Sequence, residues 1–184
     1  MTIETDKDSP VMEAALALLQ AGVRVRCRSG DSARVFMREA LGFDDGYIEG
    51  TVSTFFLDSE PVDDIDAARV KGGSRVALSA AMPGLVGAVM RRNSPYASLR
   101  AGISHDRHAA DTADSPLPSE ALVLVKLFNA VMMDRGPALL ARGVIVDAEE
   151  AEKLARLGGL PFVLRAGDAG LVDLKVLVGN RGGA

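Results

Sequence analysis

The fold is decided by the stretch VRVRCRSGDSARVFMREALG, which occupies residues 23–42. Its first six residues alternate apolar and basic side chains, and this predicts a strand whose buried face carries Val23, Val25 and Cys27. After a turn, Asp31 is expected to cap a helix. The apolar residues of that helix recur at the spacing of one buried face: Ala33, Phe36, Met37, Ala40 and Leu41. The stretch therefore predicts a strand followed by an amphipathic helix.

Comparable patterns on both sides predict the remaining elements. Helices are expected at 10–20 and 148–157, and strands at 51–57, 75–80, 121–128, 162–165 and 171–178, the last two as a hairpin. The first eight residues are expected to fray and 46–50 to form a loop, while Gly136-Pro137 is expected to disturb a helix that opens at Asn129. One core is expected to collect Phe36, Met37, Leu41, Phe56, Val76 and Leu78.

These elements predict an α+β (or α/β) protein in two parts. Residues 1–104 would form a first part with an N-terminal helix, and residues 119–184 a second, small α/β lobe. Between them, residues 105–118 are polar and carry two prolines, so they are expected to form a linker or a long loop.

Composition excludes several classes of protein. The 184 residues are 48% hydrophobic and 25% charged, which excludes wholesale disorder, and the net charge of −4 argues against a nucleic-acid partner. With a single cysteine, Cys27, the chain forms no internal disulfide, which suits a reducing compartment. No apolar run reaches the roughly 18 residues of a membrane helix, and the N-terminus does not resemble a secretory signal. The expectation is a cytoplasmic protein without a membrane partner.

Residues 23–83 carry a partial resemblance to a known family. A strand, a capped helix ending in Leu-Gly and a strand running into FFLDSEPVDD are followed by the turn and strand KGGSRVAL at 71–78. This order resembles the ubiquitin-like β-grasp of sulfur-carrier proteins, and it implies a β-grasp-like first part. Those carriers end in a free Gly-Gly carboxylate, whereas here the chain continues past Gly84 and its own last residues are Gly182-Gly183-Ala184. The resemblance therefore implies a fold, and at most an accessory role in such a pathway.

The chain shows no complete catalytic set, and no cofactor is expected from its motifs. Its two histidines stand in the segment HDRHAAD, where His105, His108 and Asp111 are candidate ligands for zinc or iron. Arg107 stands between the two histidines and the flanking residues are polar, so the same segment also reads as an exposed loop without a metal. An enzyme that uses His105 and His108 as metal ligands or as acid and base is the alternative to a non-catalytic protein.

The apolar stretch 80–92 provides the positive indication of function. Because it contains two glycines, Gly84 and Gly87, the sequence does not decide whether this stretch is a helix or a strand. The same holds for residues 96–103. Its density of apolar side chains exceeds what one face of a surface element needs, which favours an interface formed by Met82, Leu85, Val86, Val89 and Met90. Four further residues could edge that interface or bind an anion: Arg91, Arg92, Tyr96 and Arg100. The sequence thus favours a non-catalytic binding or assembly module, with a protein partner or a second copy in a homodimer.

Overall fold

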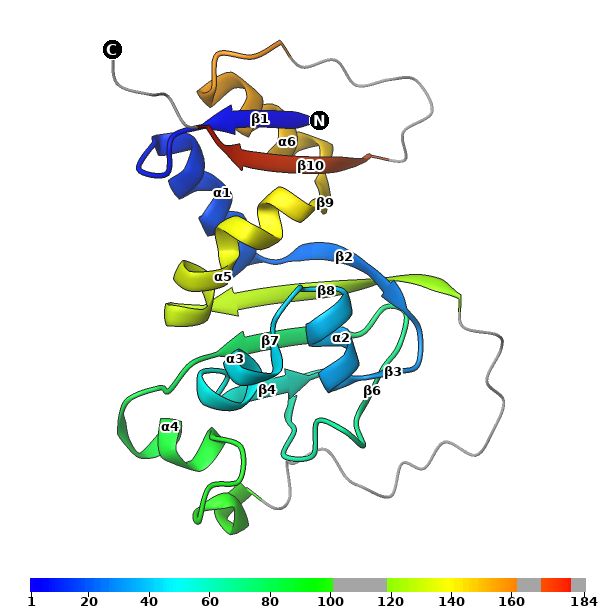
Figure 1. Cartoon of the computed structure of the whole chain (residues 1–184), viewed down its shortest axis with the longest axis vertical. Helices are drawn as coiled ribbons and strands as arrows, with labels where there is room; N and C mark the ends of the chain where they lie inside the picture. The colour runs from blue at the N-terminus through cyan, green and yellow to red at the C-terminus, as the bar shows by residue number, and fades with distance from the viewer. Residues whose placement is uncertain (101–118, 162–169, 180–184) are drawn as a thin grey trace.

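The alternating segment at 23–28 lies near the middle of a large mixed sheet. The computed structural model describes residues 1–100, 119–161 and 170–179. Within them, eight strands pair in the order β1-β10-β9-β2-β8-β7-β4-β5 (Figure 1). Their bounds are β1 Thr2–Thr5, β2 Val23–Arg28, β4 Thr54–Leu57, β5 Glu60–Pro61, β7 Arg75–Ser79, β8 Glu120–Phe128, β9 Val144–Asp147 and β10 Leu171–Val178. A separate two-stranded ladder joins β3 (Asp31–Ser32) to β6 (Arg69–Val70). The protein therefore mixes helices and strands, as predicted.

Helices cover one face of this sheet. They are α1 (Pro10–Ala21), α2 (Ala33–Glu39), α3 (Asp45–Gly50), α5 (Asn129–Arg142) and α6 (Ala148–Leu157). Ser9 caps α1. Helix α2 is capped by Ser32 rather than by the expected Asp31, which pairs with Val70 of β6. The buried residues of all five helices join those of the strands in one continuous core. Among the described residues, no helix is long and apolar enough to cross a membrane.

The predicted core is confirmed except at one position. Phe36, Met37, Leu41, Val76 and Leu78 are fully buried together. The prediction was wrong for Phe56, because the side chains of a strand alternate and β4 turns Phe55 and Leu57 toward the helices. Phe56 points to the opposite face of the sheet, where it is half-buried.

Three segments that were expected to be irregular form regular secondary structure. Residues 1–8 do not all fray, because β1 pairs in parallel with β10, and 46–50 is not a loop, because Asp44 caps α3 through the amide of Tyr47. Helix α5 runs unbroken through Gly136-Pro137. Gly136 packs so closely on α1 that a Cβ there would lie 2.7 Å from Leu16 Cδ2, so tertiary contact overrides the local signal.

Two neighbouring strands of the sheet, β2 and β9, are paired over a very short length, and we call this place the joint. Strands β2 and β9 share a single register pair, Arg24 with Ile145. Two ion pairs cross this joint on the face away from the helices: Arg24 Nη1 lies 3.1 Å from Asp147 Oδ1, and Arg26 binds Asp173 with two hydrogen bonds of 2.5 and 3.0 Å. Strands from both predicted parts of the chain belong to this one sheet, and β2 of the first part lies between β9 and β8 of the second. The proposed linker 105–118 and the predicted strand 162–165 lie outside the described residues.

Candidate functional site

The apolar stretch forms an arm, defined here as residues 82–100, at the far end of the molecule from β1 (Figure 1). It contains α4 (Gly84–Met90) and the 3₁₀ helix η1 (Ala97–Arg100), so the undecided stretches are helical at these positions, while 101–103 lie outside the described residues. Gly87 is required by the close approach of the first turn: a Cβ there would overlap the carbonyl group of Met82. The close contact that this glycine permits is therefore within the chain.

The arm presents large apolar side chains to solvent. The exposed fractions are 68% for Leu85, 69% for Val86, 50% for Tyr96 and 69% for Leu99. The other apolar candidates, Met82, Val89 and Met90, are half-buried. Of the eight large hydrophobic residues that are exposed in the described part of the chain, four stand on the arm. An apolar surface gathered on so short a segment is typical of a site of association.

Arg100 fastens the arm to the body. Its side chain is almost fully buried, and its Nη2 donates to Asp63 Oδ1 at 2.6 Å while its Nε donates to the carbonyl oxygen of Val89 at 2.7 Å. The same Asp63 oxygen accepts the backbone N–H of Asn93 at 2.9 Å. One carboxylate of the body thus holds both the start and the end of the segment that follows α4.

Arg92 provides a second attachment. Its Nε donates to the carbonyl oxygen of Val52 and its Nη2 to that of Ile48, at 3.1 and 2.8 Å. Its backbone N–H donates to Ser53. Burial lowers the pKa of the Arg92 guanidinium, and Glu49, 3.7 Å away, opposes that shift. Arg92 therefore caps carbonyl groups at the end of α3 and just beyond it.

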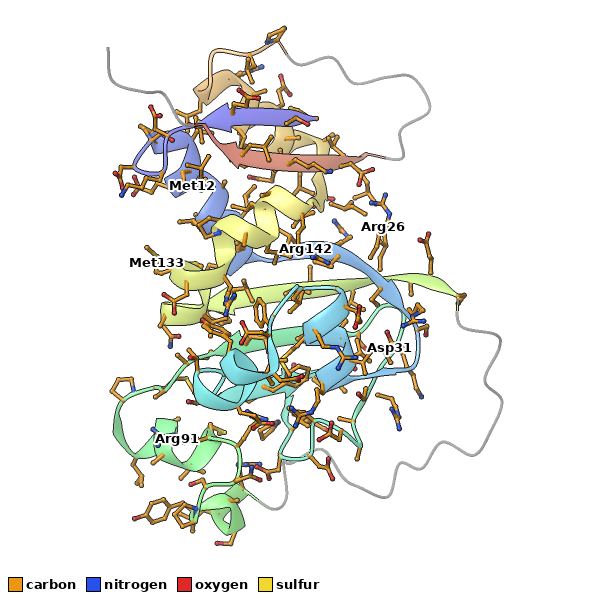
Figure 2. The ribbon with its side chains drawn as sticks, viewed as in Figure 1. Met12, Arg26, Asp31, Arg91, Met133 and Arg142 are labelled. Atoms are coloured by element: carbon orange, nitrogen blue, oxygen red, sulfur yellow. The ribbon has the colours of Figure 1, made fainter. Side chains whose placement is uncertain are left out.

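The three candidate arginines do not point to one place. Arg92 and Arg100 turn into the protein, whereas Arg91 is exposed on the arm (Figure 2). Tyr96 stands among the exposed apolar residues. Sequence reasoning missed Asp63, although its signal was present: it belongs to the acidic segment between β5 and β6, and such a carboxylate is a natural partner for a buried arginine.

A second surface feature is a hollow on the face of the sheet opposite the five helices. Its volume is about 340 Å³, and it lies over the joint between β2 and β9. Apolar residues of β8, β9 and β10 line it together with three charged ones, namely Ala121, Leu122, Ile145 and Leu171 with Arg26, Glu120 and Asp173. The pKa of the Asp173 carboxyl is lowered by its hydrogen bonds to Arg26.

The candidate metal ligands His105, His108 and Asp111 lie outside the described residues. Within residues 1–100, 119–161 and 170–179, no three side chains of His, Cys, Asp or Glu gather as a metal site would require. Cys27 is buried beside β8, as the alternation predicts, and burial raises the pKa of its thiol to about 11. A thiol with that pKa is a poor nucleophile at neutral pH.

Comparison with known proteins adds no assignment to this geometry. No family model matches the chain, and neither the curated proteins nor the solved structures yield a match.

Proposed function

We propose that this chain is a non-catalytic assembly module that associates with a second copy of itself through the arm. The observation that carries the proposal is the exposure of Leu85, Val86 and Leu99 on a segment tied to the body by Arg92 and Arg100. A segment fixed in place loses little conformational freedom when it binds, so its apolar area contributes more fully to association.

The chemistry of the surface favours a second copy as the partner. The exposed centre of the arm is apolar, and within residues 82–100 the only exposed charged side chain is that of Arg91. Interfaces between identical subunits are more apolar than those of transient complexes, and a two-fold axis brings the same patch of each copy together. Leu85 and Val86, adjacent at the start of α4, would lie at the centre of such a contact.

Sedimentation velocity over a range of concentrations tests the proposal. The wild-type chain should form a dimer, and Val86→Asp should remain a folded monomer, because a carboxylate in an apolar interface is strongly disfavoured. Met133→Asp is the matched control, since Met133 is 60% exposed but lies on α5. A wild-type chain that stays monomeric at every concentration would contradict the proposal, as would a Val86→Asp variant that dimerises like the wild type.

Other sequence-based proposals stay beside this one. An enzyme that uses His105 and His108 would be favoured by stoichiometric zinc or iron that disappears when both histidines are replaced by alanine. Three further proposals rest on the sequence alone. They are an accessory role beside a sulfur carrier, a β-grasp-like arrangement of residues 23–83 and a cytoplasmic location. If a sulfur-carrier protein co-purifies with the wild-type chain, and no longer does so with a variant from which only the arm is deleted, the accessory role would be supported.

A further inference from the structure

Strand β8 has the sequence of a strand buried on both faces, yet in the part of the chain that the structure describes one of its faces is only half-covered. Its residues ALVLVKLF are apolar at seven of eight positions. Val123, Val125 and Leu127 are fully buried under the helices, whereas Leu122, Leu124 and Phe128 point to the other face and are half-buried. Near-continuous apolar runs are typical of strands that are covered on both sides. The open side of β8 therefore has the composition of a surface that another element covers.

Neighbouring strands extend this apolar surface. Residues that pair directly across a sheet point to the same face. By register, Leu124 lies between Arg24 of β2 and Arg75 of β7, and Lys126 lies beside Ala77, which in turn pairs with Phe56 of β4. At the other end of β8, Leu122 borders the hollow over the joint. We call this surface the open face; it is formed by Leu122, Leu124, Phe128, Ala77, Phe56 and Ile145.

The charges on the open face differ from those of the chain as a whole. The chain has a net charge of −4. On the open face, Arg24 and Arg26 are matched by Asp147 and Asp173. Arg75 pairs directly with Leu124, and Lys126 lies two residues further along β8. Neither side chain forms an ion pair with any residue that the structure describes. Two carboxylates border these cations: Glu120 lines the hollow, and Asp58 Oδ1 accepts the backbone N–H of Arg75 at 2.7 Å. The apolar and cationic part of the open face is therefore limited to the Leu124 row and Lys126.

We propose that the open face docks an extended segment of a partner protein, with an apolar side chain that enters the hollow and acidic side chains that meet Arg75 and Lys126. Along β8, the hollow at Leu122 and the cation at Lys126 are four residues apart, or about 13 Å at 3.3 Å per residue. An extended partner segment that follows β8 would thus carry its apolar anchor about four residues from an acid. The hollow, at about 340 Å³, accommodates a side chain of the size of leucine or phenylalanine.

Two other occupants fit the open face less well. A second copy would bring Arg75 and Lys126 of one chain against the positive face of the other, and like charges at close range disfavour that contact. A nucleic acid would need free cations and aromatic platforms, but two arginines of β2 are neutralised by aspartates and the centre of the face is aliphatic. The proposal concerns a surface other than the arm and does not depend on dimerisation.

Selection from an unbiased library of displayed random 12-residue peptides on the wild-type chain tests the proposal. The strongest peptide is then made synthetically with a fluorophore, and its dissociation constant is measured by anisotropy. We expect enriched peptides to combine Asp or Glu with Leu, Ile or Phe. Their binding should weaken at least tenfold for Arg75→Glu/Lys126→Glu and also for Leu122→Ser, which alters the hollow without changing its charge.

The matched control for charge is Lys7→Glu/Arg38→Glu, which reverses two exposed cations away from the open face and should change binding less than twofold. Val86→Asp should bind the peptide like the wild type, which separates this surface from the arm. The proposal is overturned if no peptide is enriched, or if the enriched peptides lack acids. It also fails if Arg75→Glu/Lys126→Glu and Lys7→Glu/Arg38→Glu bind the peptide equally well. Finally, it fails if a labelled dT20 oligonucleotide binds instead of a peptide and Arg75→Glu/Lys126→Glu abolishes that binding.

Discussion

The arm and the helix-covered core both carry large apolar side chains, but these are buried in the core and exposed on the arm. In the core, Phe36 and Leu78 are fully buried and packed on every side, so they stabilise the fold. On the arm, Leu85 and Val86 are more than two-thirds exposed, while the buried groups are the guanidinium ions of Arg92 and Arg100. The core is thus held by apolar packing, and the arm by hydrogen bonds and two ion pairs. The difference separates residues that keep the chain folded from residues that are free to bind.

The largest effect is expected in the core. Phe36→Ala should lower the free energy of unfolding by about 3–5 kcal/mol, because it removes a fully buried ring and leaves a cavity. Leu85→Ala should change it by less than about 0.5 kcal/mol, since an exposed side chain contributes little to stability. Urea denaturation at low protein concentration measures both. A loss below about 1 kcal/mol for Phe36→Ala would show that the buried face of α2 is assigned incorrectly.

The next effect should be confined to the arm. Asp63→Asn removes the carboxylate charge that meets the buried Arg100, and breaking such a pair costs up to about 3–5 kcal/mol. Because the hydrogen bonds that Asp63 accepts from Asn93 and Arg100 hold the arm, we expect the loss to be local, with faster hydrogen exchange at the amides of Arg91 and Asn93. The midpoint of global unfolding should move far less than for Phe36→Ala. Equal acceleration throughout the chain would mean that arm and core unfold together.

A smaller effect is expected from overcrowding at the first turn of α4. Gly87→Ala places a methyl group against the carbonyl of Met82, and relief of such a clash costs about 1–3 kcal/mol. The arm should become more susceptible to limited proteolysis, and dimerisation should weaken. Gly50→Ala is the control, because no atom lies within 4 Å of a Cβ at that position. If Gly87→Ala matches the control in both assays, the path of the arm before α4 differs from that described.

The smallest effect lies at the joint of the sheet. Asp173 pairs with Arg26, and its lowered pKa means that the unfolded chain takes up the proton first as the pH falls. The contribution of this pair should therefore be complete at neutral pH and disappear as the pH drops through the acidic range. Since both side chains are more than half exposed, Asp173→Asn should cost about 0.2–1 kcal/mol at pH 7 and less at about pH 2. A cost that is equal at both pH values would exclude the ion pair as its source.

The helices and strands that were predicted correctly are those whose pattern of apolar and polar residues identifies them without reference to a distant part of the chain. The capped helix α1, the alternating strand β2 and the amphipathic helix α2 needed no distant partner to be recognised. Strand β1 was missed because it exists through pairing with β10, more than 160 residues away along the chain. The choice between Phe55 and Phe56 failed for a related reason: two adjacent phenylalanines give the same local pattern for either face, and the register with β7 decides.

The candidate site could be predicted in part. Apolar density between residues 80 and 92 indicated the arm, but composition cannot tell an arginine that binds a partner from one that fastens its own segment. Arg92 and Arg100 fasten the arm because Ile48, Val52 and Asp63 lie beside them in the fold, and none of these is near them in sequence. The open face of β8 could not be predicted either, because its apolar run indicates cover on both sides.

The most direct test of the arm as the association surface is the accessibility of one thiol placed on it. Val86→Cys introduces an exposed sulfur, and background labelling is small because Cys27 is buried with a thiol pKa of about 11. The rate of reaction with a maleimide is measured as the protein concentration rises, with Met133→Cys on α5 as the control. We predict that labelling of Val86→Cys slows as dimers form, while labelling of Met133→Cys keeps a constant rate. Equal and constant rates at both positions, in a range where the chain is dimeric, would contradict the account.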